Sequence, residues 1–253
     1  AQSLRQKPAA SVMVTTGLVK QGKVDACVTM GSTGAAMAAA AIVLGTMDGI
    51  DRPALGGPIL GFSPNTVFVD LGSNVDCRPN QLLSFAVIGD VFAKLFWNIE
   101  SPRVAILSIG SEPGKGNRQV KETTELISSS ALNFIGNIES NDLAQNKAEV
   151  VVCDGFVGNI VLKLVEGLSK ATLDLLHSRL QNKLSESDLS ELSSELYGLS
   201  NVTATHGGGP LLGVKGVSIV GHGQAQPEVV CKAVETAKQF VEEAAGRGVL
   251  GQG

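Results

Sequence analysis

The 253-residue sequence has few aromatic residues, few charges and no long apolar run. Aromatic residues make up 4% of the chain and charged residues 17%, whereas 43% of the residues are hydrophobic. This composition excludes a disordered chain, and the length is sufficient to bury a substantial core. Because no apolar stretch reaches the roughly 18 residues of a membrane-spanning helix, and no charged leader precedes an apolar segment, we expect a soluble globular protein.

Four cysteines, Cys27, Cys77, Cys153 and Cys231, lie far apart and form no CxxC pair. This spacing predicts neither a disulfide framework nor a zinc site, so we interpret all four as free, buried thiols of a reducing compartment. The formal net charge is −4. Proteins that bind nucleic acid usually present a basic surface, so we expect no nucleic-acid partner. The free thiols, together with the lack of a membrane span or leader, predict a cytoplasmic protein.

Short apolar runs alternate with longer helical patterns along the chain. Each run ends in glycine and polar residues, and five runs are predicted to be strands: residues 24–30, 66–71, 103–109, 149–153 and 217–220. Near-continuous apolar strands that alternate with helices are typical of a sheet covered on both faces. The sequence therefore predicts a doubly wound, mostly parallel sheet in a three-layer α/β/α architecture, with residues 1–253 forming a single domain.

Residues 168–200 depart from this alternation. Leucines recur there at intervals of three to five among Ser, Glu and Lys, and a capping sequence, SESD, interrupts them at residues 185–188. This pattern predicts a protruding pair of amphipathic helices. Its apolar side is expected to pack in the core or in a dimer interface, and the alternative is a docking face for a carrier protein or a membrane surface.

The loops after the five predicted strands are rich in Gly, Ser, Asn, Asp, Lys and His. Loops at the carboxyl ends of parallel strands converge on one crevice, where backbone N–H groups and helix N-termini bind anions. Glycine and asparagine also serve turn geometry in any α/β protein, so a single loop is weak evidence. Five such loops predict a shared anion site.

The loop at residues 108–117, SIGSEPGKGN, carries the strongest local signal. It joins a strand to a helix and contains Lys115, the only lysine in these loops, between two glycines. A phosphate at the N-terminus of the following helix would gain N–H bonds and one cation. The loop lacks the spacing and the hydroxyl of a Walker A sequence, so ATP is not expected.

Two further loops place Asn74 and Asp76 after one strand, and Asp154 and Asn159 after another. Asp and Asn favour helix N-caps, so capping alone can explain them, but Asn amides are also good donors to an oxyanion. An isolated histidine such as His222 more often makes a structural hydrogen bond than takes part in catalysis. No GxSxG or HExxH motif and no metal-ligand cluster occurs, so the motifs indicate neither a serine nucleophile nor a metal site.

Together these segments resemble the PlsX family of bacterial phosphate acyltransferases. The resemblance is carried, in the family's order, by DACVTMGSTGAAMAAA, GIDRPAL, DLGSNVDCRPNQL, SPRVAILSIGSEPGKGN, NFIGNIES, VVVCDGFVGNIVLKLVEG, HGGGPLLG and GHG. It implies a fold similar to those of isocitrate dehydrogenase and phosphotransacetylase. It also implies transfer of a fatty acyl group from acyl carrier protein to inorganic phosphate, which gives acyl-phosphate for phosphatidic acid and phospholipid synthesis.

The resemblance also implies a homodimer in the cytoplasm with loose, peripheral membrane contact and a downstream glycerol-3-phosphate acyltransferase as partner. It implies neither a metal nor a cofactor. Family members open with a further βαβ region and a DAMGGD-type loop, and this sequence begins after it. If the sequence is complete, it lacks one loop of the site and one edge of the sheet. The sequence also has GSTG where the family usually has GNTG. Its predicted helical pair is shorter and more polar than the hydrophobic helices typical of the family.

In the implied reaction, phosphate is already a nucleophile and a thiolate is a competent leaving group. The enzyme therefore needs to position phosphate and stabilise an oxyanion rather than supply a covalent nucleophile. The expected catalytic residues are Lys115, which holds phosphate or the oxyanion, and Asn159, which donates to the same centre. Supporting contacts to substrate or phosphate are expected from Ser32, Thr33, Asn74, Asp76, Gly116, Asn117, Asp154, Gly158 and His222.

Two alternatives stay open. One is a phosphotransacetylase that uses acyl-CoA on a related fold, and the other is a truncated, non-catalytic scaffold for the next acyltransferase. An acyl carrier protein has an acidic surface, so a basic rim around the site would favour the carrier. The candidates for that rim are Arg103, Arg118, Lys121, Lys163, Lys170 and Arg179.

Overall fold

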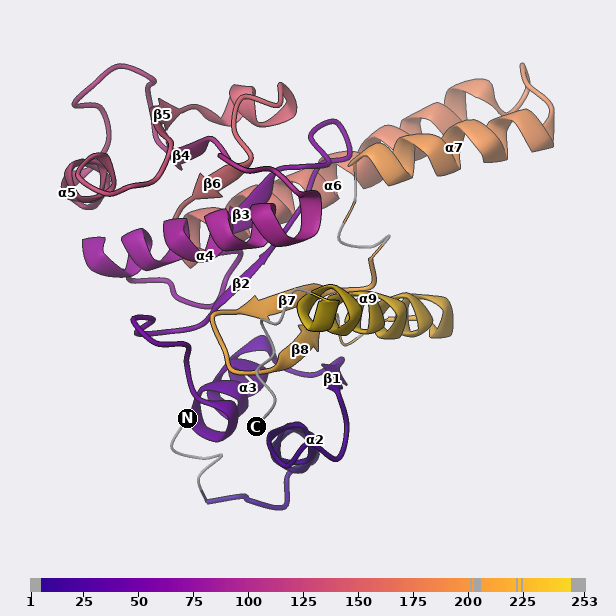
Figure 1. Cartoon of the computed structure of the whole chain (residues 1–253). Coiled ribbons are helices and arrows are strands. Elements are labelled where there is room, and N and C mark those ends of the chain that lie inside the picture. The colour runs from indigo at the N-terminus through magenta and orange to yellow at the C-terminus, as the bar shows by residue number, and fades with distance from the viewer. Residues whose placement is uncertain (1–5, 201, 203–205, 222, 224, 247–253) are drawn as a thin grey trace.

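The computed structural model describes residues 6–200, 202, 206–221, 223 and 225–246. These residues contain an eight-stranded sheet of order β1-β8-β7-β2-β3-β6-β4-β5, which runs through the centre of the molecule (Figure 1). The strands are β1 (Ala26–Thr29), β2 (Ala54–Gly57), β3 (Val67–Val69), β4 (Val104–Leu107), β5 (Phe134–Ile138), β6 (Val150–Val152), β7 (Gly209–Leu212) and β8 (Val217–Val220).

Helices cover both faces of this sheet. They are α2 (Ser11–Lys20), α3 (Thr33–Ala39) with the π-helical turn η1 (Ala40–Leu44), α4 (Pro79–Trp97), α5 (Arg118–Ser128), the 3₁₀ turn η2 (Ser140–Ala144), α6 (Gly155–Leu180), α7 (Glu186–Ser200) and α9 (Pro227–Gly246). The predicted α/β class, with helices on both faces, is confirmed.

The sheet is mixed in direction. Parallel pairings join β1 to β8, and join β3, β6, β4 and β5 to one another. β2 pairs antiparallel with both β3 and β7, and β7 pairs antiparallel with β8. The five strands predicted from apolar runs are β1, β3, β4, β6 and β8. The sequence analysis missed β2, β5 and β7, because glycine, proline or asparagine interrupts their apolar residues.

Alternate residues of the central strands enter two separate cores. In β3, Val67 and Val69 pack with Phe85 of α4, whereas Phe68 packs on the other face with Leu162 of α6. β6 and β4 repeat this alternation. Because both faces are buried, these strands are apolar at every position, which is why their sequences are continuous apolar runs.

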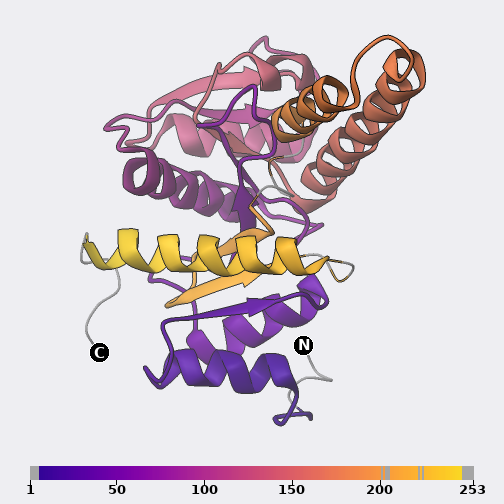
Figure 2. The ribbon, with the colours of Figure 1, turned by 90° about the vertical axis from the view of Figure 1, so that its right-hand side faces the viewer.

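α6 and α7 form the predicted helical pair, which extends away from the sheet in both views (Figures 1 and 2). Hydrogen bonds join the two helices, from Ser169 Oγ to Ser200 Oγ at 2.6 Å and between His177 Nε2 and Ser193 Oγ at 3.0 Å. Ser185 caps α7, because its Oγ accepts from Asp188 N at 3.1 Å. None of the helices in the described part of the chain combines the length and apolar character that crossing a bilayer requires.

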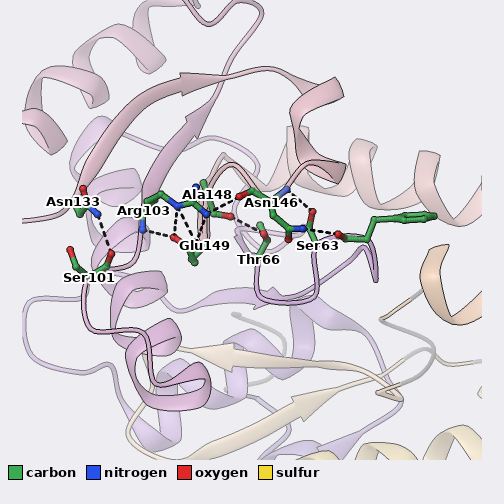
Figure 3. A network of polar contacts seen from close by, with 9 residues as sticks. Ser63, Thr66, Ser101, Arg103, Asn133, Asn146, Ala148 and Glu149 are labelled. Atoms are coloured by element: carbon green, nitrogen blue, oxygen red, sulfur yellow. Dashed lines mark hydrogen bonds and ion pairs between the residues drawn. The ribbon is translucent and has the colours of Figure 1, made fainter.

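A polar network ties together the starting ends of β3, β4 and β6 (Figure 3). Arg103 Nη2 lies 2.5 Å from Glu149 Oε1, and Arg103 N donates to Glu149 Oε2 at 2.6 Å. Burial opposes ionisation of Glu149, but the hydrogen bonds from the Arg103 side chain and backbone outweigh it and lower the pKa of this carboxyl. Thr66 Oγ1 adds a bond to Ala148 O at 2.7 Å.

We expect Arg103→Met to lower the free energy of unfolding by about 2 kcal/mol at pH 7, because the Glu149 carboxylate loses charged hydrogen bonds. A carboxyl whose pKa is lowered by folding contributes stability above its ordinary pKa of 4.5, and that contribution is lost as pH falls through the folded value. The cost of Arg103→Met should therefore shrink toward pH 3.5. Urea unfolding at both pH values measures this.

The control variant is Lys170→Met, which removes an exposed ion pair with Asp174 and should cost under about 0.5 kcal/mol. An Arg103→Met cost that is the same at both pH values would show that the ion pair does not carry the effect.

Candidate active site

Three loops meet at one end of the sheet. β3, β6 and β4 are neighbouring parallel strands, with Val69, Val152 and Ile106 in register, so the segments at 70–77, 153–159 and 108–117 leave the sheet side by side. We call these segments the three loops, although the second includes the first turn of α6, which begins at Gly155. β8 and β1 run in the opposite direction, because three antiparallel pairings separate β8 from β3. The loops after β1 and β8 therefore leave at the other end, and only three of the five loops expected to converge leave the sheet at the same end.

The carboxylate of Asp70, fully buried at the end of β3, organises the first loop. Asp70 Oδ1 accepts from Gly72 N at 3.1 Å, Ser73 N at 3.0 Å and Ser73 Oγ at 2.7 Å, and also from Leu55 N at 3.2 Å. Its Oδ2 accepts from Asn74 N at 2.7 Å. The sequence analysis missed Asp70, although an Asp before a Gly-Ser-Asn turn is a known signal for side-chain-to-backbone bonding.

Asn74 is hydrogen-bonded within the fold through its side-chain amide nitrogen and its backbone. It is buried, and its Nδ2 donates to Asp70 Oδ2 at 2.8 Å and to Pro53 O at 2.9 Å. Its backbone oxygen accepts from Gly155 N at 2.7 Å, which ties the first loop to α6. Since both amide hydrogens have partners, the Asn74 side chain holds the loop here rather than facing a substrate.

The N-terminus of α6 is built tightly against that loop. Asp154 Oδ1 caps the helix by accepting from Val157 N at 2.8 Å. A β-carbon at Gly158 would lie only 1.8 Å from Asp70 O, so glycine at this position allows the helix to touch the strand end. Asp154 and Gly158 thus have structural contacts. Asp76 is exposed on the first loop.

The Asn159 side chain faces outward in the first turns of α6. Its Oδ1 lies 3.4 Å from where a β-carbon of Gly72 would be, so its amide rests against the first loop. Asn159 is exposed, and its amide has no hydrogen-bond partner among the described residues. This amide is therefore free to donate to a ligand.

The third loop presents Lys115. Asn117 Oδ1 caps α5 by accepting from Val120 N at 2.9 Å, and Gly116 makes the turn before it with φ +102°. Asn137 of β5 lies with its Nδ2 3.3 Å from Lys115 O and 3.4 Å from Gly110 O. The Lys115 side chain is exposed, and no carboxylate of the described residues lies within ion-pair distance of it. Its ammonium is thus available to an anion.

The thiols beside these loops are not activated. Burial, followed by the negative charges of Asp70 and Asp154, raises the pKa of Cys77 to about 12, and burial also raises the pKa of Cys153. Thiols with such values stay protonated near neutral pH and are poor nucleophiles. All four cysteines are free, as predicted, but Cys77 is half-buried and Cys231 is exposed, so the expectation that all are buried was wrong for these two.

The remaining candidates lie elsewhere. Ser32 precedes α3 and Thr33 begins it, after β1, so both belong to the other end of the sheet. His222 lies outside the described residues. In the part of the chain that the structure describes, no group of three or more His, Cys, Asp or Glu side chains is placed to hold a metal ion.

Four of the six residues predicted to form a basic rim around the site are already ion-paired within the fold. Arg103 lies at the start of β4, away from the three loops, and is paired with Glu149. Three other members are ion-paired on their own helices, in the pairs Arg118–Glu122, Lys163–Glu166 and Lys170–Asp174.

Comparisons with known sequences identify a family and relatives that this chain resembles along most of its length. A sequence model of the family described as "Fatty acid synthesis protein" matches residues 1–246. The phosphate acyltransferase of Elusimicrobium minutum is 41% identical over 245 residues, which cover 96% of this chain and 72% of that protein. The phosphate acyltransferase of Pelotomaculum thermopropionicum is 42% identical over 249 residues, with the same two coverages.

Solved structures show the same fold at lower identity. A phosphotransacetylase from Streptococcus pyogenes matches with a TM-score of 0.58 and 21% identity, covering 91% of this chain and 67% of that chain. The EutD phosphotransacetylase from Staphylococcus aureus matches with a TM-score of 0.57 and 18% identity, covering 92% and 67%. These matches confirm the predicted phosphotransacetylase-like fold.

Proposed function

The chain belongs to the family described as "Fatty acid synthesis protein" and has phosphate acyltransferases as relatives at about 40% identity, and from this premise we propose how it performs acyl transfer to phosphate. It is an acyltransferase. We propose that its acyl donor is a fatty acyl thioester of acyl carrier protein, that its acceptor is inorganic phosphate, and that the acyl-phosphate product feeds phosphatidic acid synthesis.

One observation carries the assignment of the site. Lys115 and Asn159 stand on two of the three adjacent loops, and each presents an exposed functional group with no partner among the described residues. Asn74, Asp154 and Asn117, by contrast, are already bonded within the fold. The free ammonium and the free amide are therefore the groups that a bound anion would meet.

The proposed reaction is a direct displacement. Phosphate binds at Lys115 and the N-terminus of α5, where an anion is favoured by the helix dipole. A phosphate oxygen attacks the thioester carbonyl, the new C–O bond forms, and the carbonyl oxygen becomes an oxyanion that accepts from the Asn159 amide. The oxyanion then collapses, the C–S bond breaks, and the thiolate departs with the electron pair.

The surroundings suit this route, since neither Cys77 nor Cys153 is a thiolate that would form a covalent acyl-enzyme. Phosphate supplies its own nucleophilic oxygen. The protein's contribution is to position two reactants and neutralise charge, which are large terms in acyl transfer.

The homodimer, the peripheral membrane contact and the downstream glycerol-3-phosphate acyltransferase remain predictions from the family resemblance, as does a cytoplasmic location. The outer part of α6 exposes Leu164, Leu168 and Leu175 at nearly helical spacing. Such an apolar stripe is the surface that a second copy or a membrane would cover.

We expect purified protein to form acyl-phosphate from hexadecanoyl-acyl carrier protein and orthophosphate faster than from acetyl-CoA and orthophosphate. Trapping the product with hydroxylamine measures both rates. Faster reaction with acetyl-CoA would favour the phosphotransacetylase, and no trapped product from either donor would favour a non-catalytic scaffold.

A further inference from the structure

Each of the three loops at the candidate active site exposes a large apolar side chain, and the loop after β6 exposes Val157 as well as Phe156. The exposed fraction is 56% for Val75 after β3, 85% for Ile109 after β4 and 60% for Phe156 after β6. Single exposed apolar residues are common on protein surfaces, but a group of them at a ligand site indicates a binding surface. These three follow neighbouring parallel strands, at the same end of the sheet.

The contacts between the loops bring the apolar residues together. Val75 follows Asn74, whose backbone oxygen accepts from the N–H of Gly155 at 2.7 Å. Phe156 follows Gly155 directly. Val75 and Phe156 therefore directly follow the two residues that this hydrogen bond joins, which brings them close together on two loops in contact.

Ile109 and Phe156 lie next to the two free polar groups, the Lys115 ammonium and the Asn159 amide. Ile109 precedes Gly110, and a β-carbon at Gly110 would lie 2.9 Å from Lys115 Cγ, so the lysine stem crosses the backbone beside Ile109. Phe156 and Asn159 are three residues apart on α6, and Ile160 is four residues from Phe156. Residues at these spacings are neighbours on one helix face. Ile160 is exposed as well and extends the apolar surface along the helix.

We propose that Val75, Ile109 and Phe156, extended by Ile160, bind the acyl chain of the thioester substrate. The inference rests on the proposed function, because it takes the reacting carbonyl to lie between Lys115 and Asn159. An acyl chain that leaves this carbonyl meets apolar side chains on either side of the polar groups. A long chain buries apolar surface against them, whereas an acetyl group is too short to do so. These residues then determine preference for long acyl groups.

The test compares acyl groups on one carrier, hexadecanoyl-CoA and acetyl-CoA, with orthophosphate as acceptor. We expect Ile109→Ser and Phe156→Ser each to lower kcat/KM for hexadecanoyl-CoA about tenfold while leaving acetyl-CoA unchanged, because only the long chain loses apolar contact. Val234→Ser on α9, where the valine is 53% exposed, is the matched control and should change neither value. Unfolding midpoints of all three variants should equal that of the parent.

A second measurement does not depend on turnover. Calorimetry with hexadecanoic acid should show binding to the parent protein and to Val234→Ser, and about tenfold weaker binding to Phe156→Ser. If the parent forms no acyl-phosphate but this binding pattern holds, the proposed function fails and the apolar site stands. The inference would be overturned if Ile109→Ser and Phe156→Ser lowered kcat/KM equally for both acyl groups, or if they left the chain-length preference unchanged. It would also be overturned if the variants changed the sedimenting mass of the protein without changing that preference.

Discussion

Lys115→Ala is expected to lower kcat for acyl-phosphate formation by about 100- to 1,000-fold, because phosphate loses the cation that positions it for attack on the thioester. The side chain is exposed and makes no ion pair with the described residues, so the fold does not depend on its charge. The free energy of unfolding should therefore stay within about 0.5 kcal/mol of the parent value. Steady-state kinetics with trapped acyl-phosphate and urea unfolding measure the two quantities.

Lys232→Ala provides the control, because Lys232 is an exposed lysine on α9, away from the three loops. It should leave both kcat and stability unchanged. A Lys115→Ala protein that loses stability in proportion to activity would have a structural defect, and an unchanged kcat would remove Lys115 from the mechanism.

Gly158→Ala is expected to cost about 3 to 5 kcal/mol of unfolding free energy, at the upper end of the effects of single substitutions. The new β-carbon would lie 1.8 Å from Asp70 O and 3.2 Å from Cys153 Sγ. Both atoms belong to buried residues that directly follow the central strands β3 and β6, so they cannot move aside without disturbing that packing. α6 must then shift away from the first loop, and Asn159 shifts with it, so activity should fall together with stability.

The matched control for this variant is Gly167→Ala on the same helix. A β-carbon at Gly167 meets nothing within 4 Å, and alanine favours the helix over glycine by about 1 kcal/mol, so this change should be neutral or stabilising. Urea unfolding of both variants gives the comparison. Similar values for the two would mean that contact with Asp70 does not govern the cost at position 158.

Several local features follow from sequence alone because their causes lie within a few residues. Asn117 and Asp154 act as helix caps, a possibility evident from their position before helical patterns. The SESD sequence separates α6 from α7 by a side-chain cap at Ser185. The central strands β3, β4 and β6 are recognisable because burial on both faces demands apolar residues at every position.

Other features depend on partners that are distant in the chain. β2 and β7 are short and contain glycine, and they become strands through pairing with each other across more than 150 residues of sequence. Their antiparallel directions turn β8 and β1 around, which moves Ser32 and Thr33 away from Lys115. No local sequence pattern predicts this reversal of strand direction. The structural role of Asn74 is equally hidden, since it depends on a hydrogen bond to Pro53 O.

The order of residues along the chain thus determined the α/β class, the main strands, the helical pair and the loop that presents Lys115. Periodic burial and local hydrogen bonding explain these, because both act between residues close in sequence. Only the tertiary structure decided which loops share an end of the sheet and which polar side chains remain free for a ligand. Strand direction and hydrogen-bond saturation are set by contacts between segments far apart in the chain, and those contacts exist only once it is folded.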